Sequence, residues 1–136
     1  MQVAPQGWTR AFEHKSADAF ADAFAPNVVL EVSVLAKPVV GIDQVKRVMT
    51  AASKIYEALS FTHEARNAPR DYLEWEAQAF GGEQLCRITA LTKNAEGKFV
   101  HVATHHRPLD GALKFSAELG RVLQGQLDAG FFYRGA

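Results

Sequence analysis

Apolar residues recur along the chain at two different spacings, and these spacings divide the sequence into expected helices and strands. Trp8 and Phe12 fall at helical spacing, which predicts a first helix over residues 5–15. Ser16 is typical of an N-cap, and the short helix that it begins is expected to end at Pro26. The N-terminal part is therefore predicted to be helical.

A strand, a turn and a long helix are predicted next. Residues 28–35 alternate at a period of two, which is typical of a strand, and both faces are rather apolar. Pro38 favours a turn or a short edge segment, because proline cannot donate to a sheet. Gly41 precedes the best amphipathic helix of the chain, whose apolar side consists of residues three and four apart: Val45, Val48, Met49, Ala52, Ile55, Tyr56 and Leu59.

The second half of the chain is predicted to be a meander of four strands. They cover residues 60–67, 72–80, 84–93 and 98–107, and glycine, proline and asparagine mark the turns between them. After Pro108 we expect a closing helix capped by Asp110, with its buried side formed by Leu113, Ala117, Gly120 and Val122 or Leu123. The aromatic tail at residues 131–133 is expected to dock on the rest of the molecule.

Composition limits the classes of partner. The 136 residues suit one domain, with a core at about 5–108 and a C-terminal helical extension at 109–136. Fifteen basic and fifteen acidic residues leave no net charge, so neither nucleic acid nor a membrane surface is an expected partner. Cys86 is the single cysteine, and no signal segment or membrane span is recognised, so we expect a cytoplasmic protein.

Four short segments resemble the nuclear transport factor 2-like superfamily. They are residues 19–31 (AFADAFAPNVVLE), 39–45 (VVGIDQV), 96–99 (EGKF) and 107–109 (RPL), and the last two are similar to the final hairpin of its SnoaL-like polyketide cyclase branch. The resemblance follows the order of elements over about residues 8–108. It implies an α+β fold in which a cone-shaped, curved antiparallel sheet wraps around a long helix, here with an extra C-terminal helix.

Ketosteroid isomerase is the relative whose catalytic groups are the most informative to look for in this sequence. It uses a carboxylate base, a tyrosine and a protonated aspartic acid. Counting from shared landmarks, the resemblance places these groups at Val32, Trp8 and Thr89 of this chain. All three carry the wrong side chain for that chemistry. Isomerisation of a steroid by the same apparatus is therefore not expected.

Other polar residues are weak candidates for a site. Glu31 alternates away from Val32, and we interpret it as a solvated or interface carboxylate. His101 and His105 are about 13 Å apart on a regular strand, too far to share one ion, so no metal site is expected. Cys86 is interpreted as a small buried hydrophobe.

The face of the sheet that lines the cavity depends on the turn at residues 81–82. A two-residue turn would pair Glu76 with Arg87 and leave the pocket to the opposite, hydrophobic face. A three-residue loop or a bulge would instead gather Trp75, Ala77, Leu85, Arg87, Thr89, Val102, Thr104 and His106 on one face. The resemblance, which sets Thr89 inward, favours the second register.

Arg87 and His106 become the candidate catalytic residues under that register. A guanidinium in an apolar cavity requires a partner such as a ligand carboxylate or enolate, whereas the first register gives it a surface ion pair with Glu76. His106 has a side chain suited to moving a proton near neutral pH. The residues expected to bind the ligand are Trp8, Phe12, Val32, His63, Trp75, Thr89, Val102 and Thr104.

Two functional hypotheses follow. The first is a cofactor-independent SnoaL-like pocket protein that binds a small hydrophobic metabolite, and that isomerises, cyclises or dehydrates it if it is an enzyme. The alternative is a non-catalytic ligand-binding or dimeric association module. The resemblance also implies a homodimer formed through the sheet, because relatives pack their convex faces together.

Overall fold

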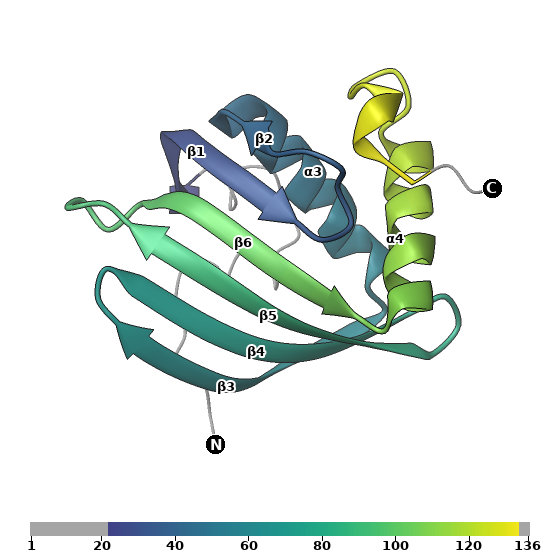
Figure 1. Cartoon of the computed structure of the whole chain (residues 1–136), viewed down its shortest axis with the longest axis horizontal. Coiled ribbons are helices and arrows are strands. Elements are labelled where there is room, and N and C mark those ends of the chain that lie inside the picture. Colours follow the sequence, from purple (N-terminus) through teal and green to yellow (C-terminus); the bar gives the residue numbers. More distant parts are fainter. Residues whose placement is uncertain (1–21, 134–136) are drawn as a thin grey trace.

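The computed structural model describes residues 22–133, which form one curved sheet and two helices (Figure 1). The strand order is β2-β1-β6-β5-β4-β3. The strands are β1 (Phe24–Val32), β2 (Val39–Val40), β3 (Ala58–Asn67), β4 (Arg70–Ala79), β5 (Glu83–Lys93) and β6 (Phe99–Arg107). The helix predicted over 5–15, and most of the helix predicted from Ser16, lie outside the described residues.

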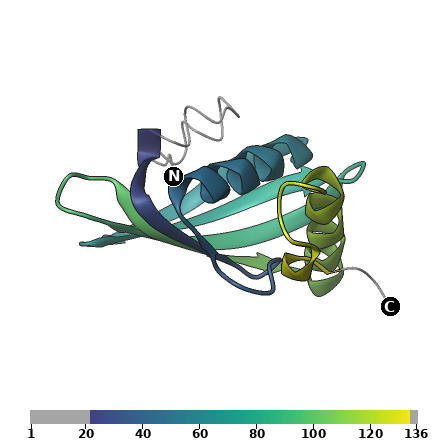
Figure 2. The same cartoon turned by 90° about the horizontal axis from the view of Figure 1, so that it is seen from above.

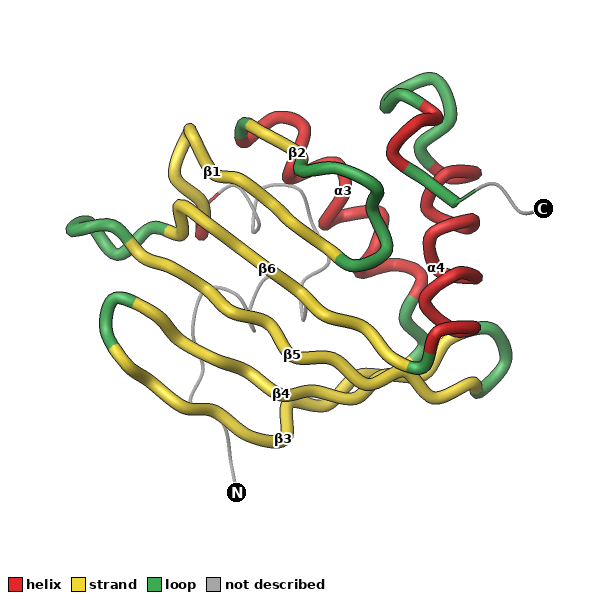
Figure 3. Tube along the Cα trace, viewed as in Figure 1, coloured by secondary structure: helices red, strands yellow, loops and turns green. Residues whose placement is uncertain are grey.

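Strands β3 to β6 form the predicted antiparallel meander, but the whole sheet is mixed because β1 runs parallel to β6. Irregularities of register interrupt β1 between Phe24 and Val29 and β3 between Phe61 and His63. Such bulges bend a strand and increase its twist. The sheet therefore curves, and the turns and loops lie at its two ends (green in Figure 3).

Strand β1 begins earlier than the sequence pattern indicated. The prediction placed a helix up to Pro26 and the strand over residues 28–35, whereas β1 starts at Phe24 and ends at Val32. Phe24 pairs with Phe99 of β6, and the exposed Pro26 lies in the irregular stretch that follows. A proline is tolerated there because the stretch makes no regular ladder.

Helix α3 (Ile42–Ile55) lies across the concave face of the sheet (Figure 2). Its N-cap is Gly41 at φ 92°, a backbone conformation that favours glycine. The predicted apolar stripe is confirmed, since Val45, Val48, Met49 and Ala52 are buried. The helix ends sooner than predicted: Tyr56 is already extended, and Leu59 belongs to β3.

Helix α4 (Leu109–Val122) stands at one end of the sheet, and the prediction of its buried side was wrong except at Leu123. Its N-cap is Pro108 rather than Asp110. The residues that α4 buries are Gly111, Ala112, Phe115, Ser116 and Leu119, followed by Leu123 beyond its end, whereas Leu113 is half-buried and Ala117 exposed. Both sets have helical spacing, so the sequence pattern alone did not separate them.

Contacts at the two ends of α4 fix its rotation. A Cβ added at Gly111 would lie 2.5 Å from Leu85 Cδ2, so α4 approaches β5 closely at this point. At the other end, Phe132 packs against Gly120 and is buried. The predicted docking of the aromatic tail is thereby confirmed, and it follows the short 3-10 helix η1 (Ala129–Phe131).

The loop between β4 and β5 decides which side chains share the concave face. Ala79 pairs with Glu83, so the loop has three residues, and its first, Phe80, has a φ of 54°. The Glu57 carboxylate accepts hydrogen bonds from the backbone N–H groups of Gly81 (3.1 Å) and Gly82 (2.9 Å). The second of the two predicted registers is confirmed, and the inward residues of β4, β5 and β6 are Leu73, Trp75, Ala77, Ala79, Leu85, Arg87, Thr89, Leu91, Val102, Thr104 and His106.

Candidate functional site

A row of large side chains crosses four strands of the concave face. Phe61 of β3 pairs with Trp75 of β4, Trp75 pairs with Arg87 of β5, and Arg87 pairs with His106 of β6. Cross-strand partners have Cβ atoms about 5 Å apart, so neighbouring side chains in the row contact each other. The register set by the three-residue loop thus brings Arg87 and His106 side by side.

The Arg87 guanidinium lies between two aromatic rings. Its Cζ atom is 3.9 Å from the ring centre of Tyr56, which follows α3, and 3.8 Å from the ring centre of Trp75. Stacking of this kind is favourable for a delocalised cation, at about 2 kcal/mol for a desolvated pair. Both faces of the guanidinium are covered, so its N–H groups point outward from the edge.

Further aromatic contacts hold this sandwich in place. Tyr56 stacks on Phe115 with ring centres 5.0 Å apart, and Phe115 lies 5.5 Å from the ring of His106. On the other side Trp75 stacks on Phe61 at 5.4 Å. Phe115 of α4 therefore links Tyr56 to His106.

Arg87 is 1% exposed, and none of its three guanidinium nitrogens has a hydrogen-bond partner among residues 22–133. An unmade hydrogen bond at a buried group costs about 1–3 kcal/mol and more for a charged one. Desolvation of the charge adds several kcal/mol, which exceeds the gain from two stacked rings. The arrangement is therefore unfavourable until something accepts from these N–H groups.

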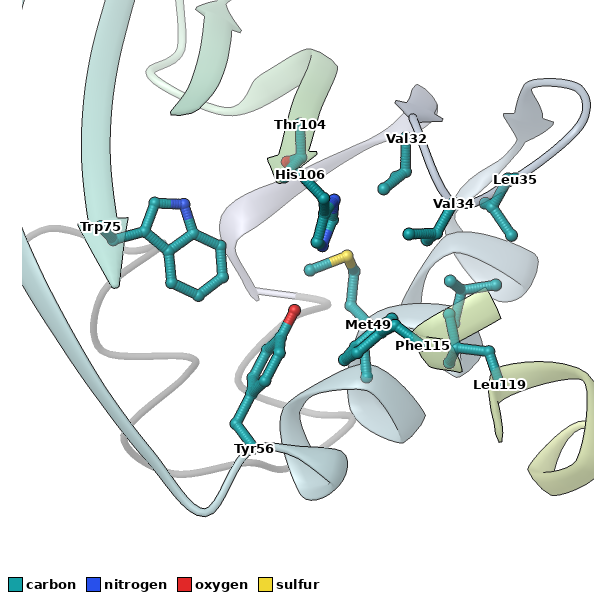
Figure 4. Close-up of a pocket in the computed structure, with 12 residues that line it drawn as sticks. Val32, Val34, Leu35, Met49, Tyr56, Trp75, Thr104, His106, Phe115 and Leu119 are labelled. Carbon is teal, nitrogen blue, oxygen red and sulfur yellow. The ribbon is translucent and has the colours of Figure 1, made fainter. Parts of the chain in front are cut away.

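Burial shifts the pKa values of both groups in the sandwich. It lowers the pKa of Arg87, and the nearby Tyr56 hydroxyl offsets part of this change. Burial also raises the pKa of Tyr56 to about 12, against a smaller opposing effect of the Arg87 charge. Tyr56 is consequently neutral at physiological pH, and its hydroxyl points toward the space between Trp75 and His106 (Figure 4).

His106 is oriented by Ser33, which directly follows β1. The backbone N–H of His106 donates to Ser33 Oγ (2.8 Å), and the same oxygen lies 3.2 Å from His106 Nδ1. His106 Nε2 is buried, and no residue in the described range 22–133 makes a hydrogen bond to it. Burial lowers the pKa of His106 well below its usual value, and the charges of Arg87 and then His105 add to this effect.

Thr89 and Thr104 form a short chain of hydrogen bonds with the neighbouring Trp75. The Trp75 indole N–H donates to Thr89 Oγ1 (2.9 Å), which is 3.0 Å from Thr104 Oγ1. These bonds satisfy buried polar atoms and fix the plane of the indole that stacks on Arg87. Thr89 therefore positions Trp75.

A hollow of about 20 Å³ lies beside this row, between the sheet and the helices (Figure 4). Its walls are mostly apolar, and it has room for about one water molecule. The residues that line it are Val32, Val34, Leu35, Val48, Met49, Ala52, Tyr56, Trp75, Thr104, His106, Phe115 and Leu119.

The predicted binding residues are divided by the structure. Val32, Trp75 and Thr104 line the hollow, whereas Thr89 and Val102 are buried on the same face without lining it. Trp8 and Phe12 lie outside the described residues. The prediction for His63 was wrong: its side chain is 67% exposed and lies 3.8 Å from Glu74. The bulge after Phe61 shifts the alternation of β3 at this point and turns His63 outward.

Three residues of the site were missed as functional candidates. Tyr56 was assigned only to the apolar stripe of its helix, and Phe115 was not among the residues predicted for the buried side of α4. Ala112, Phe115 and Leu119 also have helical spacing, but this spacing did not distinguish their side of α4 from the predicted one. Ser33 carried no signal, because its contact with His106 joins residues 73 positions apart.

Polar groups away from the concave face have ordinary partners. Glu31 is exposed and pairs with His101 Nε2 at 2.9 Å, which agrees with its interpretation as a solvated carboxylate. Cys86 is half-buried rather than buried as expected. Within residues 22–133, no three histidine, cysteine, aspartate or glutamate side chains are grouped to hold a metal ion. None of the described helices combines the length and the apolar character that a membrane crossing requires.

No protein-family model matches the sequence, and no curated protein matches it. Solved structures do match. A steroid delta-isomerase from Pseudomonas aeruginosa has a TM-score of 0.79 at 20% identity, over 87% of each chain. An NTF2-like protein of unknown function from Mesorhizobium loti scores 0.67 at 13% identity, over 74% of this chain and 85% of that one. A putative isomerase of the SnoaL-like family from Agrobacterium tumefaciens scores 0.60 at 14% identity, over 76% and 93%.

These similarities establish the fold. The chain has the nuclear transport factor 2-like, curved α+β fold that its sequence predicted. At such identities the neighbours' activities do not transfer to this chain.

Proposed function

We propose that this chain binds a small, largely apolar molecule in the hollow beneath α3, with Arg87 and His106 as its polar anchors. One observation supports this proposal most: two buried polar groups, the Arg87 guanidinium and His106 Nε2, lack partners in the described chain beside an apolar hollow. Binding sites for small molecules are mostly apolar, with a few polar groups that fix orientation. The shared fold with a steroid delta-isomerase and a putative SnoaL-like isomerase agrees with it.

The size of the hollow constrains how a guest enters. At about 20 Å³ it holds a single water, so a larger molecule requires side chains to move. Met49 is the lining residue best suited to this, because methionine is unbranched and changes rotamer readily. We expect the guest to be small and to open the hollow as it binds.

Occupation of the hollow is tested by filling it. Ala52 of α3 lines it, and Ala52→Leu adds three carbon atoms at that wall. The matched control is Ala117→Leu on the exposed side of α4. With tryptophan fluorescence or thermal shift as the readout, we expect Ala52→Leu to abolish stabilisation by small apolar compounds and Ala117→Leu to preserve it. Equal responses of the two variants would contradict the proposed location.

Two modes of action are compatible with this site. In the first, the chain only holds its ligand, which is the non-catalytic alternative. In the second, His106 Nε2 takes a proton from the carbon next to a carbonyl, and Arg87 stabilises the enolate that forms. This second mode would support isomerisation, cyclisation or dehydration without a cofactor. It requires the neutral tautomer with its proton on Nδ1.

Exchange of carbon-bound hydrogen distinguishes the two modes without knowledge of the substrate. Cyclohexanone in D₂O is followed by NMR as its α-protons are replaced. Catalysis predicts exchange with a histidine-like inflection in its pH profile that His106→Ala removes while the fold is preserved. The control is His105→Ala, whose side chain is exposed on the outer face. Exchange at the uncatalysed rate, with ligand stabilisation intact, would leave the holding mode.

We also propose that two copies associate through the outer face of the sheet, in the cytoplasm. Ile88 is 46% exposed at the centre of that face, between Glu74 of β4 and His105 of β6. Ile88→Glu should convert a dimer to a monomer in light scattering, because burying that charge is costly. Val40→Glu is the control, at an exposed apolar residue of β2. A wild-type monomer would contradict the association.

A further inference from the structure

The unpaired edge of Arg87 indicates the chemical class of the ligand. We propose that the hollow takes a small monocarboxylate, whose carboxylate accepts from the edge of the Arg87 guanidinium and from His106 Nε2, and whose short apolar tail lies against Val32, Val34 and Met49. This inference rests on the binding function proposed above. It selects the holding mode, in which His106 donates a hydrogen bond.

The aromatic sandwich determines the direction of approach. Tyr56 and Trp75 cover the two faces of the guanidinium at 3.9 and 3.8 Å, so a partner must approach in its plane. A carboxylate is planar and accepts two parallel N–H bonds in that plane. A neutral carbonyl offers one oxygen, so it would leave more of the buried donors unpaired.

The hydrogen bonds of Ser33 favour the donor tautomer of His106. Ser33 Oγ already accepts from the His106 backbone N–H, so its own proton is available for Nδ1 at 3.2 Å. A neutral imidazole that accepts at Nδ1 carries its proton on Nε2. His106, which lines the hollow, then offers Nε2 as a donor from the position on β6 that pairs with Arg87 on β5.

The charge of the site fits a single negative charge. Arg87 is the charged member of the row, and none of the described residues that line the hollow is acidic. The other cation of β5, Lys93, is paired with Asp71 at 3.0 Å and is not available to a ligand. One carboxylate therefore neutralises the site, whereas a dianion would bring a second, uncompensated charge into an apolar wall.

The test compares acids with their neutral amides on the full chain. Acetate, butyrate and hexanoate are titrated by calorimetry and thermal shift against acetamide, butyramide and hexanamide, which match them in shape. We expect each acid to bind at least about tenfold more tightly than its amide, since charge-assisted bidentate pairs are the stronger ones. The amide affinities should rise with tail length until the hollow is full.

Variants of Arg87 test whether this residue causes the preference for the acid over its amide. Arg87→Met should remove the preference for the acid while hexanamide still binds, and Arg87→Lys should keep only part of it, because lysine lacks the planar fork. Control titrations use Lys93→Met, which changes the other cation of β5.

Each outcome has a separate meaning. Equal binding of acid and amide by the wild-type chain would overturn the carboxylate inference and leave the proposed binding function standing. Binding of neither series would overturn both. A preference that persists in Arg87→Met would place the anion elsewhere and overturn the inference. If that variant does not fold, the comparison of acids with amides on the wild-type chain still tests the inference.

Discussion

Strand β5 carries two cations, and their surroundings differ in the one feature that matters for function. Lys93 lies 3.0 Å from the Asp71 carboxylate and 5.6 Å from the ring centre of Phe99, with a third of its side chain exposed. Arg87, six residues earlier, is buried between two rings without a carboxylate beside it in the described chain. Lys93 has the environment of a structural ion pair.

The comparison teaches how to distinguish a structural cation from one that awaits a partner. A cation that only stabilises the fold is expected to have its counter-charge in place, because a buried unpaired charge is costly. At Arg87 the chain supplies stacking from two rings and leaves the hydrogen-bonding edge unsatisfied. The unfavourable contribution to the stability of the ligand-free protein therefore arises at Arg87, where a bound ligand would offset it. The following predictions test this difference, beginning with the largest expected effect.

Removing the ring on one face of Arg87 should have the largest effect. Trp75→Ala deletes a buried indole that stacks on both Arg87 and Phe61, and we expect it to lower the free energy of unfolding by about 3–5 kcal/mol. Trp75→Phe should cost less, since a ring remains and mainly the hydrogen bond to Thr89 is lost. Urea denaturation measures both. Equal losses would show that stacking on the guanidinium is unimportant.

Removing the charge should have opposite effects at the two cations. Arg87→Met should raise the free energy of unfolding of the ligand-free protein by about 1–2 kcal/mol, because it removes an unpaired buried charge and retains an apolar stem. Lys93→Met should lower it by about 1 kcal/mol, because it leaves the buried Asp71 carboxylate without its partner. The measurement is thermal and urea unfolding of both variants. A destabilised Arg87→Met would mean that the guanidinium already has a partner in the free protein.

The pH dependence of stability should report the depressed pKa of His106. Because its folded pKa lies below its unfolded value of about 6.5, the unfolded chain binds the proton first as the pH falls. Stability is thus complete above about pH 6.5 and declines below it, with a limiting slope of about 1.4 kcal/mol per pH unit.

Substitution of His106 tests whether this residue causes the decline in stability below about pH 6.5. His106→Gln should flatten the decline between pH 6.5 and the folded pKa, while His105→Gln on the outer face should preserve most of it, because His105 has the smallest of the three effects on the His106 pKa. Arg87→Met should raise the folded pKa of His106 part of the way back toward its usual value, so that the decline ends at a higher pH, because the Arg87 charge is the second cause of the shift after burial. Unfolding measured at half-unit pH steps would contradict this assignment if His106→Gln had the wild-type profile.

The smallest effect is expected at Ser33. Ser33→Ala removes the oxygen that accepts from the His106 backbone and contacts its Nδ1, which should lower the free energy of unfolding by about 0.5–1.5 kcal/mol. Ser33→Thr keeps a hydroxyl and serves as the control. If Ser33 sets the tautomer of His106, the Hε1 chemical shift of that ring should change in Ser33→Ala and remain in Ser33→Thr.

The sequence by itself determined the elements of this protein because their signals are local. Alternation at a period of two located β3 to β6 to within about two residues at each end, and the spacing of Val45, Val48 and Met49 located α3. The order of these elements was enough to indicate the fold. Alternation also determined that Arg87 and Thr89 share a face.

Only the tertiary structure decided what meets on that face. The loop at residues 80–82 is held by Glu57, a residue from another element, and a loop one residue shorter would have placed Arg87 opposite Glu76. Likewise Tyr56 and Ser33 reach the site through packing of α3 and the turn after β1, and the rotation of α4 depends on its approach to Leu85. Such contacts join residues far apart in the chain, and their free energy depends on the whole packed structure rather than on any local pattern.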